Sequence, residues 1–188
     1  TGDDENNTII SGDDNDIIRG LQGADYIDGG VGDDDTIDFS AGTQGLIIDL
    51  SATQTFGIDT TYRVQDDGFG NKEFAANVEN VIGTDLIDII IGNSQDNKLE
   101  SGDEADTLYG GAGFDTLIGG TGSDTFRGGT GDDIIYGNAE STTSSDGDRD
   151  LVDFSTSSTP VKVNLSSVDT ILLSKETTTT LLVQTSIG

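Results

Sequence analysis

The block between Gly110 and Gly137 constrains the fold more than any other stretch. It reads GGAGFDTLI, GGTGSDTFR and GGTGDDIIY, with glycine at positions one, two and four, aspartate at six and an apolar residue at eight. Glycine takes positive φ without steric cost, so each unit should begin with a tight loop. The residues after it favour a short strand with one apolar side chain on one face. Because so short a strand cannot stand alone, we predict that neighbouring units stack around a shared interior as a parallel solenoid.

The same nine-residue frame extends towards the N-terminus. It fits residues 83–91, 92–100, 101–109, 11–19 and 20–28. Residues 29–38 carry one extra residue, so Asp34 and Asp35 compete for position six, and Asn7 and Ile9 fit a degenerate first unit. So dense a repetition indicates a repeat architecture and not an isolated motif.

This pattern resembles the RTX nonapeptide family, whose GGxGxDxUx repeat binds calcium. The resemblance covers roughly half the chain and implies an all-β, right-handed parallel β-roll in which two successive units form one turn. It also implies that calcium lies between stacked loops, held by loop carbonyls and by the position-six side chains of units n and n+2. The position-six ligands implied are Asp16, Asp25, Asp34 or Asp35, Asp88, Asn97, Asp106, Asp115, Asp124 and Asp133.

The resemblance also implies how these ligands pair. The pairs are Asp16 with Asp34, Asp88 with Asp106, Asp106 with Asp124 and Asp115 with Asp133, and, more weakly because asparagine is uncharged, Asn7 with Asp25 and Asn97 with Asp115. The implied loop ligands belong to the glycines at positions two and four: Gly23, Gly30, Gly32, Gly102, Gly111, Gly113, Gly120, Gly122, Gly129 and Gly131. We expect about eight Ca²⁺ ions.

The charge of the chain agrees with a need for cations. There are 36 acidic and 8 basic residues, a formal charge of −28, and 29 of the acids are aspartate. Aspartate suits turns and hard-cation coordination, and so large a charge opposes compaction unless counter-ions neutralise it. We therefore predict that folding and calcium binding are one transition, with affinities of about 10⁻⁴ to 10⁻³ M typical of extracellular modules.

Composition also excludes several classes of function. The chain has no cysteine and no histidine, which excludes zinc, haem, thiol and histidine-based chemistry within it. Its charge disfavours nucleic acid. It shows no long apolar run and no Sec-type signal. RTX proteins commonly leave the cell by a one-step, type I route, so we expect a secreted or cell-surface location without membrane insertion. The chain is expected to be a piece of a longer protein.

Composition shifts divide the chain into five segments. These are repeat block 1 (1–38), a strand-rich connector (39–82), repeat block 2 (83–138), an inserted loop and irregular turn (139–150) and a second connector (151–188). The first connector should hold a strand with Leu46, Ile48 and Leu50 inward, anchored further by Tyr62, Val64, Phe74, Val78, Val81 and Ile82.

The two connectors are copies of each other. Asp38-Phe39-Ser40 and LIIDLS ending at Ser51 recur, 115 residues later, as Asp153-Phe154-Ser155 and VKVNLS ending at Ser166. Moreover, Gly188 followed by Thr1 would recreate the Ile-Gly-Thr sequence of residues 82–84. We hypothesise that the chain is one period of a tandem array, or a subunit that stacks head to tail. The alternative is that this fragment was simply cut from a longer protein at a convenient boundary.

Two further features each have two interpretations. Asp146-Gly-Asp148-Arg-Asp150 resembles the opening of an EF-hand loop, although Leu151 and Ser157 replace the required Gly and Glu; Asp148 and Asp150 either bind an extra calcium or form a solvated turn. Outward-facing positions are unusually apolar: Ile89, Ile91 and Tyr109 on one sheet, and Ile118, Ile134 and Tyr136 on the other. They mark either a contact site or a surface covered by a connector or insertion.

Three functional classes follow. The leading one is a calcium-stabilised extracellular structural protein, in a surface layer, filament or adhesin stalk. The second is the secretion and folding module of a larger exported enzyme or toxin. The third is an enzyme, since carboxylate pairs can cleave glycosides. The repeating loops account for these carboxylates, so we predict no catalytic site.

Overall fold

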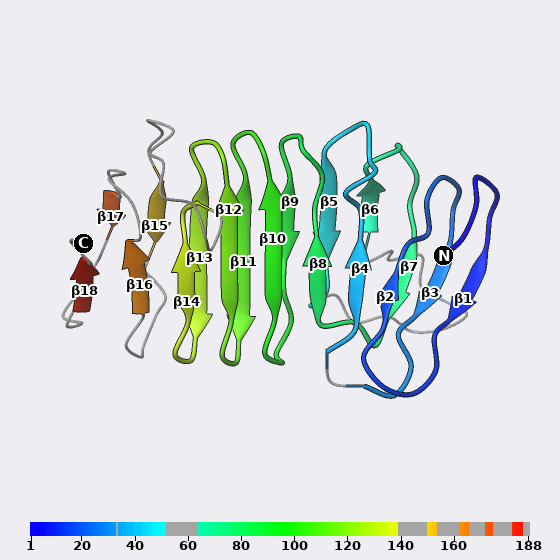
Figure 1. Ribbon diagram of the computed structural model, residues 1–188, viewed down its shortest axis with the longest axis horizontal. Helices are drawn as coiled ribbons and strands as arrows, with labels where there is room; N and C mark the ends of the chain where they lie inside the picture. Colours follow the sequence, from blue (N-terminus) through cyan, green and yellow to red (C-terminus); the bar gives the residue numbers. More distant parts are fainter. Residues whose placement is uncertain are drawn as a thin grey trace.

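The protein is described here from a computed structural model, which describes residues 1–32, 34–51, 64–138 and 150–153 and the backbone of residues 162–165, 172–174 and 182–185. Every regular element within these residues is a β-strand (Figure 1). The strands are β1 (Thr8–Ile10), β2 (Ile17–Ile18), β3 (Tyr26–Asp28), β4 (Thr36–Asp38), β5 (Leu46–Asp49), β6 (Val64–Asp67), β7 (Phe74–Ala76), β8 (Asn80–Ile82), β9 (Ile89–Ile91), β10 (Lys98–Gly102), β11 (Thr107–Ala112), β12 (Thr116–Gly120), β13 (Thr125–Thr130), β14 (Ile134–Tyr136), β15 (Leu151–Asp153), β16 (Lys162–Leu165), β17 (Leu172–Ser174) and β18 (Leu182–Thr185).

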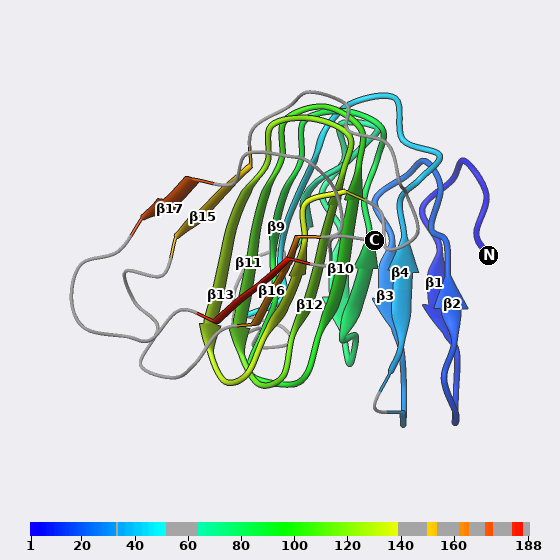
Figure 2. The same cartoon turned by 60° about the vertical axis from the view of Figure 1, so that its left-hand side comes forward.

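The strands form a parallel β-roll, as the repeat predicted. An eight-stranded sheet has the order β18-β16-β14-β12-β10-β8-β4-β2 and a seven-stranded sheet has the order β17-β15-β13-β11-β9-β5-β6. Successive strands of the second repeat block alternate between these two sheets, which face each other in Figure 2. Lys98 pairs with Thr116, and Thr107 with Thr125, so one turn of the roll spans two nonapeptides.

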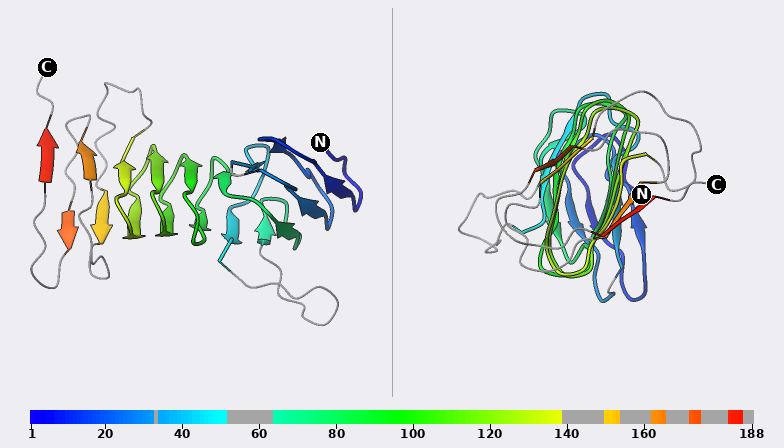
Figure 3. Two further views of the ribbon diagram at one scale, coloured as in Figure 1. Left: turned by 90° about the horizontal axis from the view of Figure 1, so that it is seen from below. Right: turned by 90° about the vertical axis from the view of Figure 1, so that its left-hand side faces the viewer.

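Position-eight side chains fill the interior between the sheets. The strands of the nonapeptide units are so short that each places one large side chain on the inner face, and the parallel register stacks these side chains coil upon coil. The residues concerned are Ile18, Ile27, Ile37, Val81, Ile90, Leu99, Leu108, Leu117, Phe126, Ile135 and Val152, all at most 2 % exposed. The coils of the second repeat block, coloured green to yellow, lie almost on top of one another when viewed along the roll (Figure 3, right).

The first connector departs from the regular coil. Leu46, Ile48 and Leu50 are buried, which confirms the strand predicted there. However, β6 pairs with β5 in the antiparallel sense, the one such pair among the described strands. The side chains of Asp66 and Asp67 accept backbone N–H bonds from the turn that follows, at 2.8–3.0 Å, and so reverse the chain.

After this turn, β7 joins β3 in a three-stranded sheet of order β1-β3-β7. Its Phe74 ring stacks on Tyr26 with centroids 4.7 Å apart. Of the other anchors predicted for the connector, Val64, Val78 and Val81 are buried and Ile82 is half-buried, whereas Tyr62 lies outside the described residues.

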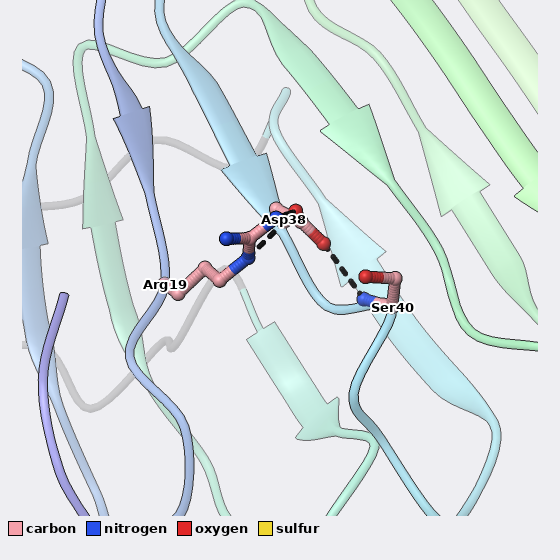
Figure 4. A network of polar contacts seen from close by, with 3 residues as sticks. All are labelled: Arg19, Asp38 and Ser40. Atoms are coloured by element: carbon pink, nitrogen blue, oxygen red, sulfur yellow. Dashed lines mark hydrogen bonds and ion pairs between the residues drawn. The ribbon is translucent and has the colours of Figure 1, made fainter.

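The repeated Asp-Phe-Ser motif joins adjacent coils by ion pairs on the outer face. The Oδ2 of Asp38 forms an ion pair with Arg19 of the preceding coil, and its Oδ1 accepts the Ser40 N–H at 2.9 Å (Figure 4). Burial alone would raise the pKa of Asp38, but the bonds from Ser40 and Arg19 lower it. In the second copy, Asp153 pairs with Arg127 at 2.5 Å, and Arg127 also lies over the Tyr109 ring. The aspartate of the motif therefore makes an ion pair in both copies.

The apolar outward positions are only partly exposed. Ile89 is 39 % exposed, and Ile91, Tyr109, Ile134 and Tyr136 are half-buried. Ile118 is only 6 % exposed and does not belong to the hydrophobic core cluster, so this residue fits a covered outer position and not an open contact site.

Candidate metal sites

Position-six residues stack in three columns along the edges of the roll, because the loop of each unit lies directly over the loop two units earlier. The first column, before the seven-stranded sheet, contains Asp88, Asp106, Asp124 and Asp150. The second, before the eight-stranded sheet, contains Asp16, Asp35, Glu79, Asn97, Asp115 and Asp133. The third, before the three-stranded sheet, contains Asn7, Asp25 and Glu73.

One hydrogen bond recurs down these columns. The backbone N–H of a position-six residue donates to a carboxylate oxygen of the next member, at 2.8–3.2 Å. It joins Asn7 to Asp25, Asp16 to Asp35, Asp35 to Glu79, Asp88 to Asp106, Asn97 to Asp115, Asp106 to Asp124, Asp115 to Asp133 and Asp124 to Asp150. Each of these bonds occupies one oxygen of the accepting carboxylate and fixes its direction.

The second carboxylate oxygen of six members is buried and accepts no hydrogen bond from the described part of the chain. These atoms are the Oδ2 of Asp16, Asp25, Asp35, Asp106, Asp115 and Asp133. Burial raises the pKa of Asp106 to about 6 and that of Asp115 to about 7, and it also raises the pKa of Asp25 and Asp133. Buried carboxylates without a counter-charge fit a hard divalent cation, which takes oxygen ligands.

Backbone carbonyls complete the surroundings of these oxygens. No group of three or more acidic side chains suited to a metal gathers within the described residues, so a cation would also need loop oxygens. A side chain on the positive-φ Gly120, Gly129 or Gly131 would overlap the carbonyl oxygen of Gly102, Gly111 or Gly113. A side chain at position one would instead overlap Oδ2, as at Gly110 with Asp115. The glycines therefore keep carbonyls and carboxylates close together.

The remaining predicted loop glycines lie in the same kind of contact. Side chains on Gly23, Gly30 and Gly32 would overlap the carbonyls of Glu5, Gly12 and Asp14, and those on Gly102, Gly111, Gly113 and Gly122 the carbonyls of Thr84, Asn93, Gln95 and Glu104. All ten predicted glycines thus lie against the loop two units earlier.

The structure corrects the position-six assignment in the unit with an extra residue. Asp35 is fully buried and accepts the Asp16 N–H at 2.8 Å, whereas Asp34 is exposed and accepts a bond from Asn15. The pair predicted as Asp16 with Asp34 is therefore Asp16 with Asp35.

Asp150 also occupies position six. It accepts the Asp124 N–H at 3.0 Å, and a side chain on Gly137 would overlap its Oδ2, as in regular units. In sequence, residues 137–153 thus fit one nonapeptide unit with eight extra residues, and Asp150 is buried at its position six and does not lie in a solvated turn. Asp148 lies outside the described residues.

Sequence reasoning missed two connector residues, Glu73 and Glu79. Both are buried and stand at position six, but Gly68 at position one is the single repeat glycine before Glu73, and Glu79 has none. The signal that could have found Glu79 is the frame of residues 74–82, which places Val81 at position eight.

A family model for RTX calcium-binding nonapeptide repeats matches four copies, in residues 1–35, 82–117 and 118–141, just over half of the chain. The chain belongs to this RTX repeat family. RTX repeats bind calcium, in agreement with the oxygen-lined columns. A search among curated proteins found no match.

Not every RTX unit of this chain leaves its carboxylate open. We call residues 2–10, 83–91 and 92–100 the self-bonded units, because the position-two N–H donates to the position-six side chain of the same unit. Asp3 donates to Asn7, Thr84 to Asp88 and Asn93 to Asn97, at 2.7–2.8 Å.

The backbone at position two decides between the two states. In the six units whose Oδ2 accepts no bond, position two has positive φ; these residues are Gly12, Leu21, Gly30, Gly102, Gly111 and Gly129. In the self-bonded units, Asp3, Thr84 and Asn93 have ordinary φ, and their N–H groups turn towards the side chain. Asp88 gains two more bonds, from the Leu46 N–H and the Thr84 hydroxyl. The RTX coil at residues 83–100 is thus held by the chain's own donors.

This difference gives a prediction about ion number. Asp115→Asn should bind one or two calcium ions fewer than the wild type, because an oxygen open to a cation is lost from one or both neighbouring sites. Asp88→Asn should bind as many ions as the wild type and lose about 1–3 kcal/mol of stability from its hydrogen bonds. Equilibrium dialysis at saturating calcium counts the ions. Asp34→Asn, which changes an exposed carboxylate, is the control, and a loss of ions in Asp88→Asn would contradict the distinction.

Proposed function

We propose that this chain is a calcium-folded structural repeat module that works outside the cell, in a surface layer, filament or adhesin stalk. The regular columns of buried, unpartnered carboxylate oxygens carry the proposal, because cations placed there would join neighbouring coils. RTX repeat proteins are typically exported, which supports an extracellular location. No helix within the described residues is long and apolar enough to cross a membrane.

The same columns support a non-catalytic role. Asp35, Asp115 and Asp133 each hold one oxygen against a neighbouring backbone N–H and the other inside the stack, so these acids serve packing between coils. We assign the calcium ligands to the position-six residues of the units that are not self-bonded and to the carbonyls at positions two and four, and we expect about eight ions in all.

End-to-end association is supported by the edges of the sheets. Among the described strands, β1 and β2 at one end and β17 and β18 at the other have a partner on one side only. Open strand edges are templates for another chain. Ile10 and Ile17, at the first of these ends, are 65 % and 67 % exposed. Together with the Ile-Gly-Thr sequence that a head-to-tail junction would recreate, these edges favour stacking of copies along the roll.

An edge variant tests this proposal. The Asn7 carbonyl and the Ser11 N–H both bond to the β3 side. Backbone groups of alternate residues point to opposite sides of a strand, so the Ile10 N–H points to the open edge. Ile10→Pro should remove that donor and leave the β1–β3 pairing intact. Electron microscopy should show calcium-dependent fibres or sheets for the wild type and much shorter assemblies for Ile10→Pro. Monomers at every calcium concentration would refute the assembly proposal.

The alternative is that the chain is a secretion and folding module of a larger exported enzyme or toxin. The buried carboxylates support it, because they make folding depend on calcium. A chain that needs calcium to fold would stay expanded where calcium is scarce, which suits export before folding. The sequence context decides between the two: many such modules without a catalytic domain favour the structural role, and one array beside a catalytic domain favours the export role.

A further inference from the structure

Glu73 is the most unusual acidic residue outside the nonapeptide blocks. It immediately precedes β7, and its backbone exchanges hydrogen bonds with Val64 at 3.1 and 3.4 Å. Because β7 pairs with β3 so that Phe74 lies beside Tyr26, Glu73 lies beside Asp25 in the third column. The connector, which the family model does not match, therefore supplies a position-six residue to the first repeat block.

The Glu73 side chain is fully buried, and no N–H or O–H of the described chain donates to either of its carboxylate oxygens. Asp25 is 3 % exposed; one of its oxygens accepts the Asn7 N–H at 2.8 Å, and its Oδ2 accepts no such bond. The two side chains thus present three buried oxygens that no N–H of the described chain satisfies, and a proton between the two carboxyl groups is the one hydrogen bond open to them.

These oxygens converge on one place. A side chain added at Gly20 would come within 3.0 Å of Glu73 Oε1 and would overlap Asp25 Oδ2. Gly20 is therefore the residue whose missing side chain lets two carboxylates, from the residues just before β3 and β7, face the same small space. A shared proton between them would be one way to hold them there.

Nearby charge makes that space strongly negative. Burial raises the pKa of Glu73 to about 9, and the charges of Asp67 and Asp25 add to this. Asp67 is itself buried, but its oxygens accept bonds from the Phe69 and Asn71 N–H groups and the Asn71 side chain. None of the ion pairs found among the described residues involves these three acids. Their negative charge must be neutralised by protons or by a bound cation.

We propose that Asp25 and Glu73 hold a divalent cation, with calcium as the physiological ion, which fastens the connector hairpin of residues 64–76 to the first repeat block. The choice of calcium rests on the proposed function, whereas the site itself rests on the convergent buried oxygens. Such an ion would join residues 48 positions apart in the sequence and close the third column. The site differs from a regular unit because its second acid comes from a glutamate outside the repeat.

The decisive experiment counts ions in Glu73→Gln. At saturating calcium, this variant should bind one ion fewer than the wild type while its far-UV circular dichroism remains that of a folded roll. Asp67→Asn is the matched control, because it removes a charge from the same cluster but from a carboxylate already satisfied by the chain. Its ion count should equal that of the wild type.

Terbium luminescence provides a second readout that does not depend on counting the bound calcium ions. Tyr26 neighbours Asp25 in sequence and stacks on Phe74, which neighbours Glu73, so tyrosine excitation should sensitise terbium bound there. Tyr26→Phe and Glu73→Gln should each lose this part of the emission. If Glu73→Gln fails to fold, loss of the signal in Asp25→Asn replaces it.

Failure of the inference and failure of the proposed function look different. A wild type that binds no calcium would overturn the proposed function. A wild type that binds calcium and a Glu73→Gln variant that binds as many ions would show that protons alone neutralise this cluster, and would overturn the site.

Discussion

Chelation of calcium at about pH 7.5 should unfold this protein, and lowering the pH to about 5 without calcium should restore part of its β-structure. Six buried Oδ2 atoms accept no hydrogen bond from the described chain. Each costs about 1–3 kcal/mol when nothing compensates it, so together they match the whole stability of an ordinary domain, about 5–15 kcal/mol. The formal charge of −28 adds repulsion.

The sign of the pH effect follows from the pKa values. Burial raises the pKa of Asp106 to about 6 and that of Asp115 to about 7, from 3.8. The folded, calcium-free chain therefore binds more protons than the unfolded chain between these values. The stability contributed by these groups is fully present below about pH 4 and is lost as the pH rises through about 6 and 7. Calcium needs the ionised carboxylates, so with calcium the stability should instead increase across the same range.

Urea unfolding followed by circular dichroism, at several pH values with calcium and with chelator, measures both slopes. Sodium chloride at equal ionic strength controls for screening of the surface charge. Magnesium is a second control, because it gives up its water reluctantly and should stabilise the roll less than calcium. A calcium-free protein that stays folded at about pH 7.5 would contradict the prediction, as would stability curves with the same slope in both conditions.

The parts of the fold predicted from sequence are those fixed by the nine-residue period. Glycine spacing gives the loops, position eight gives the core, and two units per turn give the pairing of Thr107 with Thr125. Asp115 and Asp133 meet for the same reason. The period holds no information on where an inserted residue is absorbed, which is why Asp34 and Asp35 could not be distinguished before the structure placed Asp35 inside.

Other parts depend on contacts that no local pattern encodes. Glu73 reaches position six only because an antiparallel turn brings β7 back to β3. Asp150 reaches it after eight extra residues. Leu21 takes φ of 69° at position two although it is not glycine, because the stacked coils impose the loop conformation. Asp88 is self-bonded although it is an aspartate, so aspartate at position six does not by itself make a unit open, and the backbone angle at position two matters as well.

Gly129→Ala should destabilise the second repeat block by roughly 3–5 kcal/mol and raise the calcium concentration needed for folding. Two effects combine: Gly129 has φ of 113°, where alanine is strained, and its new methyl group would overlap the carbonyl oxygen of Gly111 in the loop two units earlier. That carbonyl is one of the proposed calcium ligands, so the overlap should separate the two loops and weaken the sites between them.

Gly12→Ala is the matched control, because Gly12 has nearly the same backbone angle, φ of 117°, with no atom within 4 Å of the added methyl group. Gly12→Ala should lose only about 1–2 kcal/mol of stability, the cost of placing alanine at this backbone angle, and should need nearly the same calcium concentration to fold. Calcium titrations of both variants, followed by circular dichroism, separate the conformational cost from the steric one. If the two variants behave alike, close stacking of the loops contributes nothing to calcium binding, and the placement of carbonyl ligands at position two is wrong.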